Sequence, residues 1–296
     1  MYDRWVMNPR FRRCALALAL CLAATGAYAC AQTASPTASP SPAPSATPSG
    51  PSDPCGSILS TVNRPTFTTG VCTLQTGHFD IENGYTNYVT TGPGGGNDGT
   101  YPQSLVRVGT FDPHLDVELG LPSFNRASTG GTITSGWSDL NVGAKYELGY
   151  GARWLYGVNT VVTLPTGSKA FSAGNAQFTG NFNWSYAVNS VIGVAGTLGF
   201  NAMSAYNAAG SPQSYFAFVP TLEVSAALPG TPNQLFGEYA EFSQAGPNLG
   251  GRSYFDFGYE RDFGPHVQFD VEYGFSPTLV AGQKQHYVGA GLSFMH

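Results

Sequence analysis

The sequence contains few charged residues and no long hydrophobic run after its N-terminal region. Only 10% of its 296 residues are Asp, Glu, Lys or Arg, whereas soluble domains carry about 25%. Exposed helix faces need such residues, so the composition disfavours a helical or α/β protein. No later run approaches the roughly 18 apolar residues of a membrane-spanning helix. The 38 Gly, 16 Tyr and 19 Phe residues favour strands, turns and interfacial aromatic side chains instead.

Basic residues are the scarcer charged class, and this bears on possible partners. The formal net charge is -5, and without the first thirty residues nine basic side chains face seventeen acidic ones. Proteins that bind nucleic acid neutralise phosphates with Lys and Arg. We therefore expect no nucleic-acid partner.

The region after Gly77 alternates apolar and polar residues in short segments. In one of them Leu115, Val117 and Leu119 fall on one face, and Asp116 and Glu118 fall on the other. Only a strand has this period of two. An open sheet in lipid would leave backbone groups unpaired, so such strands must close on themselves. The pattern predicts an all-β fold: a closed antiparallel transmembrane β-barrel of about 12 strands.

The connections between the expected strands alternate in length. We expect strands near 78–90, 102–111, 114–122, 137–148, 152–164, 176–187, 190–202, 213–228, 233–243, 252–263, 266–275 and 286–295. Long loops are expected at 91–101, 123–136, 165–175, 203–212, 244–251 and 276–285, with short connections between them. Outer-membrane barrels have short periplasmic turns and long extracellular loops, which places both ends of the barrel in the periplasm.

The same alternation separates a lipid face from a lumen face. A charge near the middle of the lipid face costs about 2–4 kcal/mol, so charged residues within strands should point inward. There they either contact a passing solute or form an internal network in which Arg107, Lys145 and Arg153 pair with carboxylates; the network is favoured, with a small residual passage. The candidate lumen-lining residues are Asp80, Glu82, Arg107, Asp116, Glu118, Asp139, Lys145, Glu147, Arg153, Glu223, Asp256, Glu260, Asp270 and Glu272.

The N-terminus has the pattern of a secretory signal peptide. Arg10, Arg12 and Arg13 precede the apolar stretch 14–24, and small residues follow up to Ala31. We expect a signal peptide at 1–31, with cleavage after Ala31 favoured over cleavage after Ala29 and over lipidation of Cys30. Export through such a signal fits a location in the bacterial outer membrane.

The next segment, 32–54, consists almost entirely of Ala, Ser, Thr and Pro. It has no large apolar side chain that could anchor a core, so we expect a disordered linker. A tail without a partner is favoured over a segment that contacts the cell wall. A periplasmic N-terminal segment at 55–76 and the barrel at 77–296 complete the expected organisation.

Cysteine is rare, and three of the five cysteines lie in or beside the signal. Cys55 and Cys72 remain, and in an oxidising compartment two thiols favour a disulfide. A metal site is the alternative, but His78 is the only further ligand nearby. We therefore expect a disulfide and no metal.

No catalytic motif stands out. His78, His114, His266, His286 and His296 lie apart from any Gly-x-Ser-x-Gly turn. The Gly-rich stretch 91–99 has neither the following helix nor the Lys of a phosphate-binding loop, and we expect a mobile surface loop there. The sequence predicts no enzymatic activity and no cofactor.

Three blocks of the sequence resemble one family. The first is Asn63-Arg64-Pro65-Thr66-Phe67 with Gly77-His78-Phe79-Asp80-Ile81-Glu82, and the second is Val106-Arg107-Val108-Gly109 leading to Leu115-Asp116-Val117-Glu118-Leu119. The third is Gly136-Trp137-Ser138-Asp139-Leu140 with Gly143-Ala144-Lys145-Tyr146 and then Leu164-Pro165-Thr166-Gly167. These resemble the outer-membrane transporters of the meta-pathway of phenol degradation family. The chain departs from the family pattern at Asn63, where an acidic residue is usual, and at its end, which is not a terminal aromatic residue.

The resemblance implies a transporter or channel for passive passage of small, aromatic or otherwise hydrophobic, organic compounds. Its implied partners are outer-membrane lipids, a small organic solute and the barrel-assembly machinery. The alternative is a structural or adhesive barrel that acts through extracellular loops such as 91–101 and 123–136.

Overall fold

A computed structural model describes residues 54–207, 209–277, 279 and 282–296. The expected signal peptide and the linker up to residue 53 lie outside the described residues. One short helix, α2 (Ile58–Thr61), precedes the strands. The strands are β1 (Phe79–Thr91), β2 (Gly96–Gly109), β3 (Leu115–Gly120), β4 (Phe124–Thr129), β5 (Thr132–Trp137), β6 (Leu140–Tyr150), β7 (Trp154–Leu164), β8 (Gln177–Ala187), β9 (Ile192–Tyr206), β10 (Pro212–Ala227), β11 (Asn233–Phe242), β12 (Arg252–Asp262), β13 (Val267–Ser276) and β14 (Lys284–Met295).

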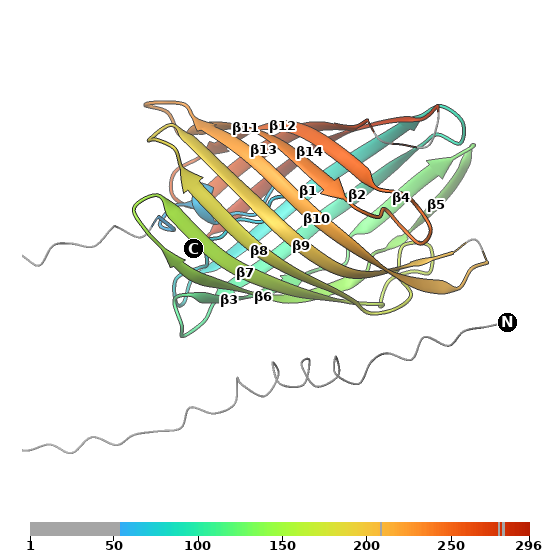
Figure 1. Cartoon of the computed structure of the whole chain (residues 1–296), viewed down its shortest axis with the longest axis horizontal. Coiled ribbons are helices and arrows are strands. Elements are labelled where there is room, and N and C mark those ends of the chain that lie inside the picture. The colour runs from blue at the N-terminus through green and yellow to red at the C-terminus, as the bar shows by residue number, and fades with distance from the viewer. Residues whose placement is uncertain (1–53, 208, 278, 280–281) are drawn as a thin grey trace, which may run out of the picture. The chain divides into compact units, whose positions relative to one another are not determined.

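The fourteen strand segments form twelve barrel strands, as predicted. β3 and β4 both pair with β2, one with each half of it, and so form one interrupted strand. β5 pairs with β4 and β6 pairs with β3, so β5 and β6 together form the next barrel strand. Figure 1 shows β4 and β5 continuing the barrel toward the end opposite the C-terminus.

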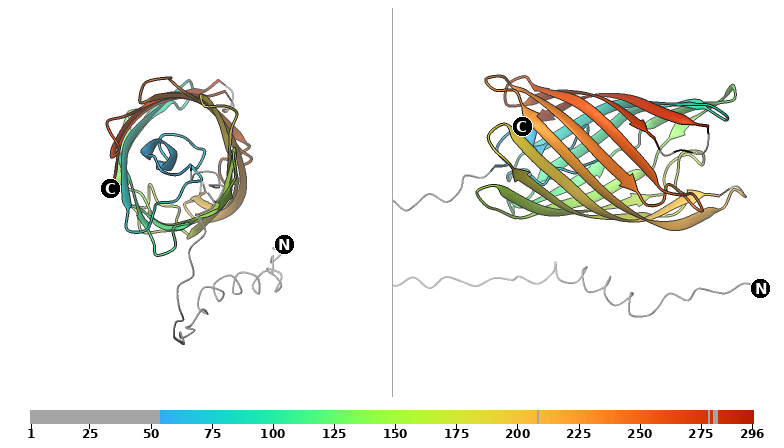
Figure 2. Two further views of the ribbon diagram at one scale, coloured as in Figure 1. Left: turned by 90° about the vertical axis from the view of Figure 1, so that its left-hand side faces the viewer. Right: turned by 45° about the horizontal axis from the view of Figure 1, so that its top comes forward.

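The sheet closes through β1, which pairs antiparallel with both β14 and β2. The β1–β14 ladder runs from Asp80 opposite Met295 to Thr91 opposite Lys284. Phe79 and His296 extend it through two reciprocal backbone hydrogen bonds of 3.1 and 2.9 Å. Figure 2 shows the resulting ring end-on. The predicted closed antiparallel barrel is confirmed.

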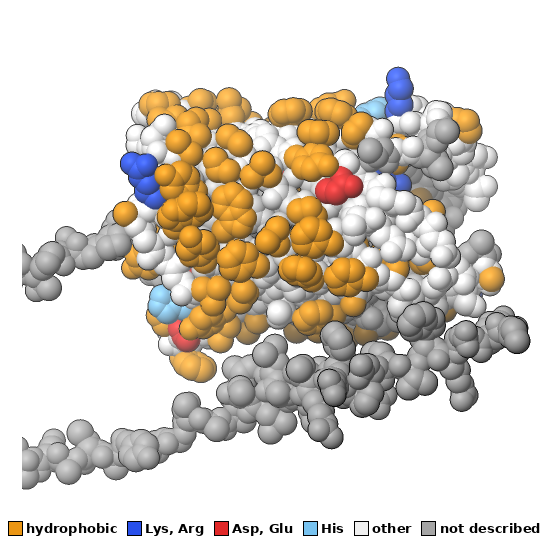
Figure 3. All heavy atoms as spheres, in the orientation of Figure 1, with side chains coloured by type: hydrophobic (Ala, Val, Ile, Leu, Met, Phe, Trp, Pro, Cys, Tyr) orange, Lys and Arg blue, Asp and Glu red, His pale blue; other side chains and the backbone are white. Residues whose placement is uncertain are grey.

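The outer face of the barrel is apolar, as the alternation predicted. Trp154, Tyr156, Phe178, Phe257 and Tyr273 are all more than one third exposed. Figure 3 shows hydrophobic side chains covering most of one side of the barrel, with few charged ones among them. Among the described residues, no helix is both long and apolar enough to cross a membrane.

Two predicted loops are wrong. Within 91–101 only residues 92–95 connect strands, because 96–101 belong to β2. Within 123–136 the chain forms the hairpin of β4 and β5, with a turn at Gly130 and Gly131, which both have positive φ. A strand that extends beyond the bilayer needs no apolar outer face, so these polar segments carry no alternation to predict them. The expected strict alternation of short and long connections therefore fails at its first two long positions.

The segment before β1 lies inside the barrel. Figure 2 shows residues near the start of the described chain, coloured blue, within the ring of strands. The backbone of Thr61 and Cys72 contacts the lumen residue Arg107, and Phe67 contacts Glu238 on the opposite wall. We call residues 54–78 the plug. The expectation that 55–76 is a periplasmic segment is corrected: a polar lumen offers this segment hydrogen-bond partners that it cannot supply itself.

Candidate functional site

The plug is fixed near its start by the predicted disulfide, which the structure confirms. Cys55 and Cys72 are bonded, with their Cα atoms 5.2 Å apart. Both are buried with Val71 and with Leu155 of β7 in a small hydrophobic cluster. The bond encloses α2 and the stretch that faces the lumen, so it limits how far this part of the plug can extend.

Arg107 of β2 anchors the plug to one side of the wall. The guanidinium is fully buried and lies 2.5 Å from Asp116, 3.5 Å from Glu118, 3.7 Å from Asp80 and 3.9 Å from Glu82. It also donates to the carbonyl oxygens of Thr61 at 2.5 Å and Cys72 at 2.9 Å. One cation thus joins four carboxylates of the wall to two carbonyl groups of the plug.

Lys145 of β6 adds a second buried cation beside Arg107. Its Nζ lies 3.9 Å from Glu118 and donates to Asn63 Oδ1 of the plug at 2.6 Å. The backbone N–H of Asn63 donates to Glu82 at 3.0 Å. Asn63 therefore contacts a cation through its side chain and a carboxylate through its backbone.

Arg64 crosses to the place where the barrel closes. Its Nη2 lies 3.3 Å from Asp270 of β13, and its Nη1 donates to Gln103 of β2 at 3.1 Å. The guanidinium lies against Gly84 and Gly291, which face each other in the β1–β14 ladder. A Cβ atom on either glycine would collide with the guanidinium, so the close approach depends on the missing side chains.

On the far wall Glu238 of β11 accepts from two successive backbone groups of the plug. The N–H groups of Phe67 and Thr68 lie 2.7 and 2.5 Å from its two carboxylate oxygens. The hydroxyls of Thr68 and Thr221 are 2.6 Å apart, and the N–H of Thr69 donates to Thr197 at 3.0 Å. The middle of the plug is therefore bound across the whole width of the lumen.

The structure buries twelve of the fourteen predicted lumen residues. They are Asp80, Glu82, Arg107, Asp116, Glu118, Asp139, Lys145, Glu147, Asp256, Glu260, Asp270 and Glu272. Glu223 is half-buried and lines a cavity beside the plug. Asp139 accepts from the N–H groups of Gly167 and Ala173, at 2.8 and 2.7 Å, and so holds the loop 165–176.

Arg153 is the exception. It is exposed in the connection 151–153 that precedes β7, and its guanidinium lies 3.4 Å from the hydroxyl of Tyr186. The prediction that Arg153 belongs to a lumen network is wrong. The strand begins two residues later than expected, and a residue outside the strand has no fixed face.

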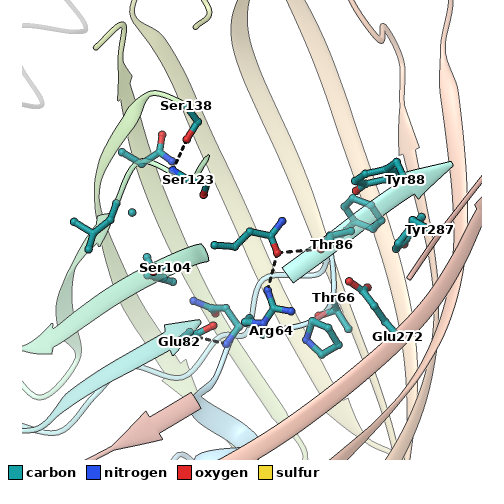
Figure 4. A pocket seen from close by; sticks show the side chains of 18 residues that line it. Arg64, Thr66, Glu82, Thr86, Tyr88, Ser104, Ser123, Ser138, Glu272 and Tyr287 are labelled. Atoms are coloured by element: carbon teal, nitrogen blue, oxygen red, sulfur yellow. Dashed lines mark hydrogen bonds between the residues drawn. The ribbon is translucent and has the colours of Figure 1, made fainter. Parts of the chain in front are cut away.

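Two cavities lie on opposite sides of the plug. The wall cavity, of about 370 Å³, is lined by Asn63–Phe67 of the plug and by β1, β2, β13 and β14; Figure 4 shows it with Arg64 and Thr66 at its edge. The inner cavity, of about 240 Å³, lies at the strand ends beside the short turns. Arg64 and Thr66 line both cavities, so these residues separate them.

The wall cavity reaches an interruption in the barrel wall. Tyr101 pairs with Phe124, and Leu105 pairs with Gly120, in one continuous register, but the three residues between them on each strand form no ladder pairs. One backbone hydrogen bond, from Leu121 to Ser104 at 2.8 Å, crosses this gap. Ser104 and Leu121 line the cavity, and Leu121 is 41% exposed on the outside of the barrel. Figure 4 shows Ser104, Ser123 and Ser138 on this side of the cavity.

A comparison with known protein families identifies the chain. The model of the family described as putative MetA-pathway of phenol degradation matches residues 62–294. The chain belongs to this family. The match begins within the plug and ends within β14, so the phenol-degradation family model covers the plug from Val62 together with the barrel.

Solved structures share the fold at low sequence identity. The outer membrane channel from Pseudomonas putida F1 has a TM-score of 0.57 and 15% identity, over 76% of this chain and 98% of that chain. The NanC porin has a TM-score of 0.48 and 10% identity, over 73% and 98%. The KdgM porin in complex with disordered oligogalacturonate has a TM-score of 0.47 and 11% identity, over 72% and 98%. No curated protein matches the sequence.

Several residues of the site were not predicted. Glu238 follows the period of two on its strand, where Leu235 is exposed and Phe236 is buried, so the alternation could have found it. Asn63, Arg64 and Phe67 belong to a block that marked the family, but nothing in that block indicates a position inside the lumen. Their partners are distant in sequence, which leaves no local pattern to detect.

Proposed function

We propose that this protein is a passive channel of the bacterial outer membrane for small, aromatic or otherwise hydrophobic, organic compounds. The observation that carries the proposal is the wall cavity, which extends from the plug to the interruption in the wall. The family membership supports the same class of compounds. The fold shared with the Pseudomonas channel fits a barrel that spans the outer membrane.

The position of the plug suggests the direction of passage. Arg64 and Thr66 separate the wall cavity from the inner cavity, so a straight path along the barrel axis meets the plug. The interruption beside Ser104 and Leu121 offers a hydrophobic compound a path from the lumen into the bilayer. The free energy of a lipid-soluble compound falls when it leaves water for the acyl chains, so passage along this path needs no other energy source.

The plug and wall also bear on enzymatic function. Several buried carboxylates that would attract attention as acid–base groups have structural partners: Asp116 and Glu118 pair with Arg107, Glu238 accepts from the backbone of the plug, and Asp256 accepts from the Tyr287 hydroxyl. These interactions support a structural role for them, and we propose no catalysis. The adhesive alternative named the loops 91–101 and 123–136 as examples. Only four residues of the first connect strands, the second forms the hairpin of β4 and β5, and we do not propose this alternative.

Uptake by whole cells tests the proposal. Cells that produce the barrel should take up radiolabelled toluene across an intact outer membrane faster than cells that lack it. Replacing Ser104 and Ser138 together by Trp places rings at the interruption and should slow this uptake. Leu198→Trp, on the exposed outer face of β9, serves as the control. Equal uptake with and without the barrel would contradict the channel, and normal uptake by the double variant would contradict the lateral path.

A further inference from the structure

A third cavity, of about 250 Å³, lies between the plug and strands β9 to β12. We call it the aromatic cavity because Phe67, Tyr88, Tyr215, Phe242 and Tyr254 line it. The rings of Phe67 and Tyr254 have centroids 5.2 Å apart, and Phe242 meets Phe67 edge-on at 6.0 Å. Tyr88 also lines the wall cavity, where Figure 4 labels it, so the two cavities are neighbours.

One buried polar atom that lines this cavity, the carboxamide oxygen of Asn201, has no hydrogen-bond partner among the described residues. Asn201 of β9 is 9% exposed. It pairs with Ala217 across the β9–β10 ladder, and the neighbouring Phe200 is half-exposed on the outside, so Asn201 points inward. A buried carbonyl oxygen without a partner is uncommon because its lost hydration is not replaced.

We propose that the aromatic cavity binds a small, uncharged aromatic ring that carries a hydroxyl group, with the hydroxyl at Asn201. A cavity of about 150 Å³ is enough to hold benzene, so this one has room for a single substituted ring. Aromatic side chains attract such a ring through offset-stacked and edge-to-face contacts. The inference rests on the proposed function, since it names the compounds that the lumen selects.

A hydroxyl group suits Asn201 better than a carboxylate does. It can donate to the carboxamide oxygen, and it can also accept from the carboxamide nitrogen if the amide is turned over. A carboxylate can only accept, so it would leave the oxygen unpaired in the orientation that the structure has. Arg252 is the residue on this cavity that an anion would prefer, and its Nη1 donates to the Tyr254 hydroxyl at 3.2 Å.

The test measures binding to the purified full-length barrel in lipid nanodiscs by equilibrium dialysis, with empty nanodiscs as the background. The probes are radiolabelled phenol, toluene and benzoate. Asn201→Leu removes the hydrogen-bonding group and nearly keeps the volume, so phenol affinity should fall about tenfold while toluene affinity stays unchanged. Ala217→Phe places a ring in the cavity and should abolish binding of both.

Two controls keep the test specific. Asn181→Leu changes an asparagine of β8 that lines none of the three cavities and should leave phenol affinity unchanged, while Arg252→Gln shows whether benzoate binding depends on that guanidinium. Each variant is first checked for the shift in gel mobility on heating that marks a folded barrel. Unchanged phenol affinity in Asn201→Leu or in Ala217→Phe would overturn the inference, as would tighter binding of benzoate that depends on Arg252.

The result separates this inference from the proposed function. A wild-type barrel that speeds toluene uptake into cells but binds neither ring in nanodiscs would overturn the aromatic site and leave the channel standing. A barrel that binds phenol through Asn201 but does not speed uptake would contradict the channel and leave the binding site standing.

Discussion

The two halves of the lumen wall satisfy their carboxylates in different ways. On β1 to β6 the wall supplies its own cations, Arg107 and Lys145, which pair with Asp116 and Glu118 among others. On β11 to β14 no described Lys or Arg of these strands pairs with the buried carboxylates, and Asp270 instead pairs with Arg64 of the plug.

The plug matches this difference along its length. Toward the half with cations it presents the carbonyl oxygens of Thr61 and Cys72 to Arg107, together with the backbone N–H groups of Asn63 and Leu74 to Glu82 and Asp116. Toward the acidic half it presents donors, the guanidinium of Arg64 and the N–H groups of Phe67 and Thr68. Strands β1 to β6 therefore depend less on the plug to satisfy their buried carboxylates than strands β11 to β14 do. Substitutions can test this difference.

The largest effect is expected for Arg107→Met. The substitution leaves four buried carboxylates without their main cation, and removing one partner of a buried ion pair costs about 3–5 kcal/mol. The barrel should fail to fold, or should unfold at much lower urea concentrations, as measured by gel mobility with and without heating. Arg126→Met, at an exposed position on β4, is the control. Normal stability of the Arg107 variant would show that the first half does not depend on its own cation.

The next effect is expected for the double variant Cys55→Ser and Cys72→Ser. The bond closes a loop with a sequence separation of 17, and a loop of this size is stabilised by about 3 kcal/mol in the chain-entropy model. The plug should become sensitive to protease while the strands stay protected, as mass spectrometry of the fragments would show. A plug as resistant as in the wild type would mean that the wall contacts alone hold it.

A smaller effect is expected for Arg64→Met. Hydrogen bonds to charged groups are worth about 1.5–3 kcal/mol, and this variant loses those to Asp270 and Gln103. The side chain that separates the two cavities is also changed, so single-channel conductance in planar bilayers should rise. Arg261→Met, exposed near the short turn after β12, should conduct like the wild type. Unchanged conductance of the Arg64 variant would show that strands β11 to β14 hold the plug in place without Arg64.

The smallest effect is expected for Glu238→Gln. The neutral amide keeps one acceptor for the plug, so the loss should be about 1 kcal/mol. Hydrogen exchange of the Phe67 and Thr68 amides should become faster, with Glu241→Gln on the same strand as the control. Hydrogen exchange at the wild-type rate would show that Arg64, and not Glu238, holds the plug against strands β11 to β14.

The sequence was sufficient for the strands and for most of their faces, for a physical reason. Within the bilayer each strand must be apolar outside, so the period of two places Asp116, Lys145 and Asp256 in the lumen. Outside the bilayer a strand no longer needs an apolar outer face. The predictions of loops at 91–101 and 123–136 and of a lumen position for Arg153 failed in these parts of the chain.

The plug could not be predicted for a different reason. Residues 55–76 show neither the strand period of two nor the helix period of 3.6. Their partners Glu82, Glu238 and Asp270 look in the sequence like any other carboxylates that point into the lumen. Whether an acidic side chain faces water or a backbone N–H group is decided by segments that meet only in the folded barrel. The aromatic cavity has the same origin, because Phe67 comes from the plug and the other rings from the wall.

The contact of Arg64 with paired glycines has a consequence for how the barrel is made. Gly84 and Gly291 belong to the first and last strands, which are the two ends of the sheet until it closes. A group that binds both ends stabilises the joined state over the open one by the free energy of that contact. Arg64 therefore stabilises the closed barrel only when the plug is inside it. Insertion of the plug and pairing of the first strand with the last are thermodynamically coupled, so each favours the other during assembly.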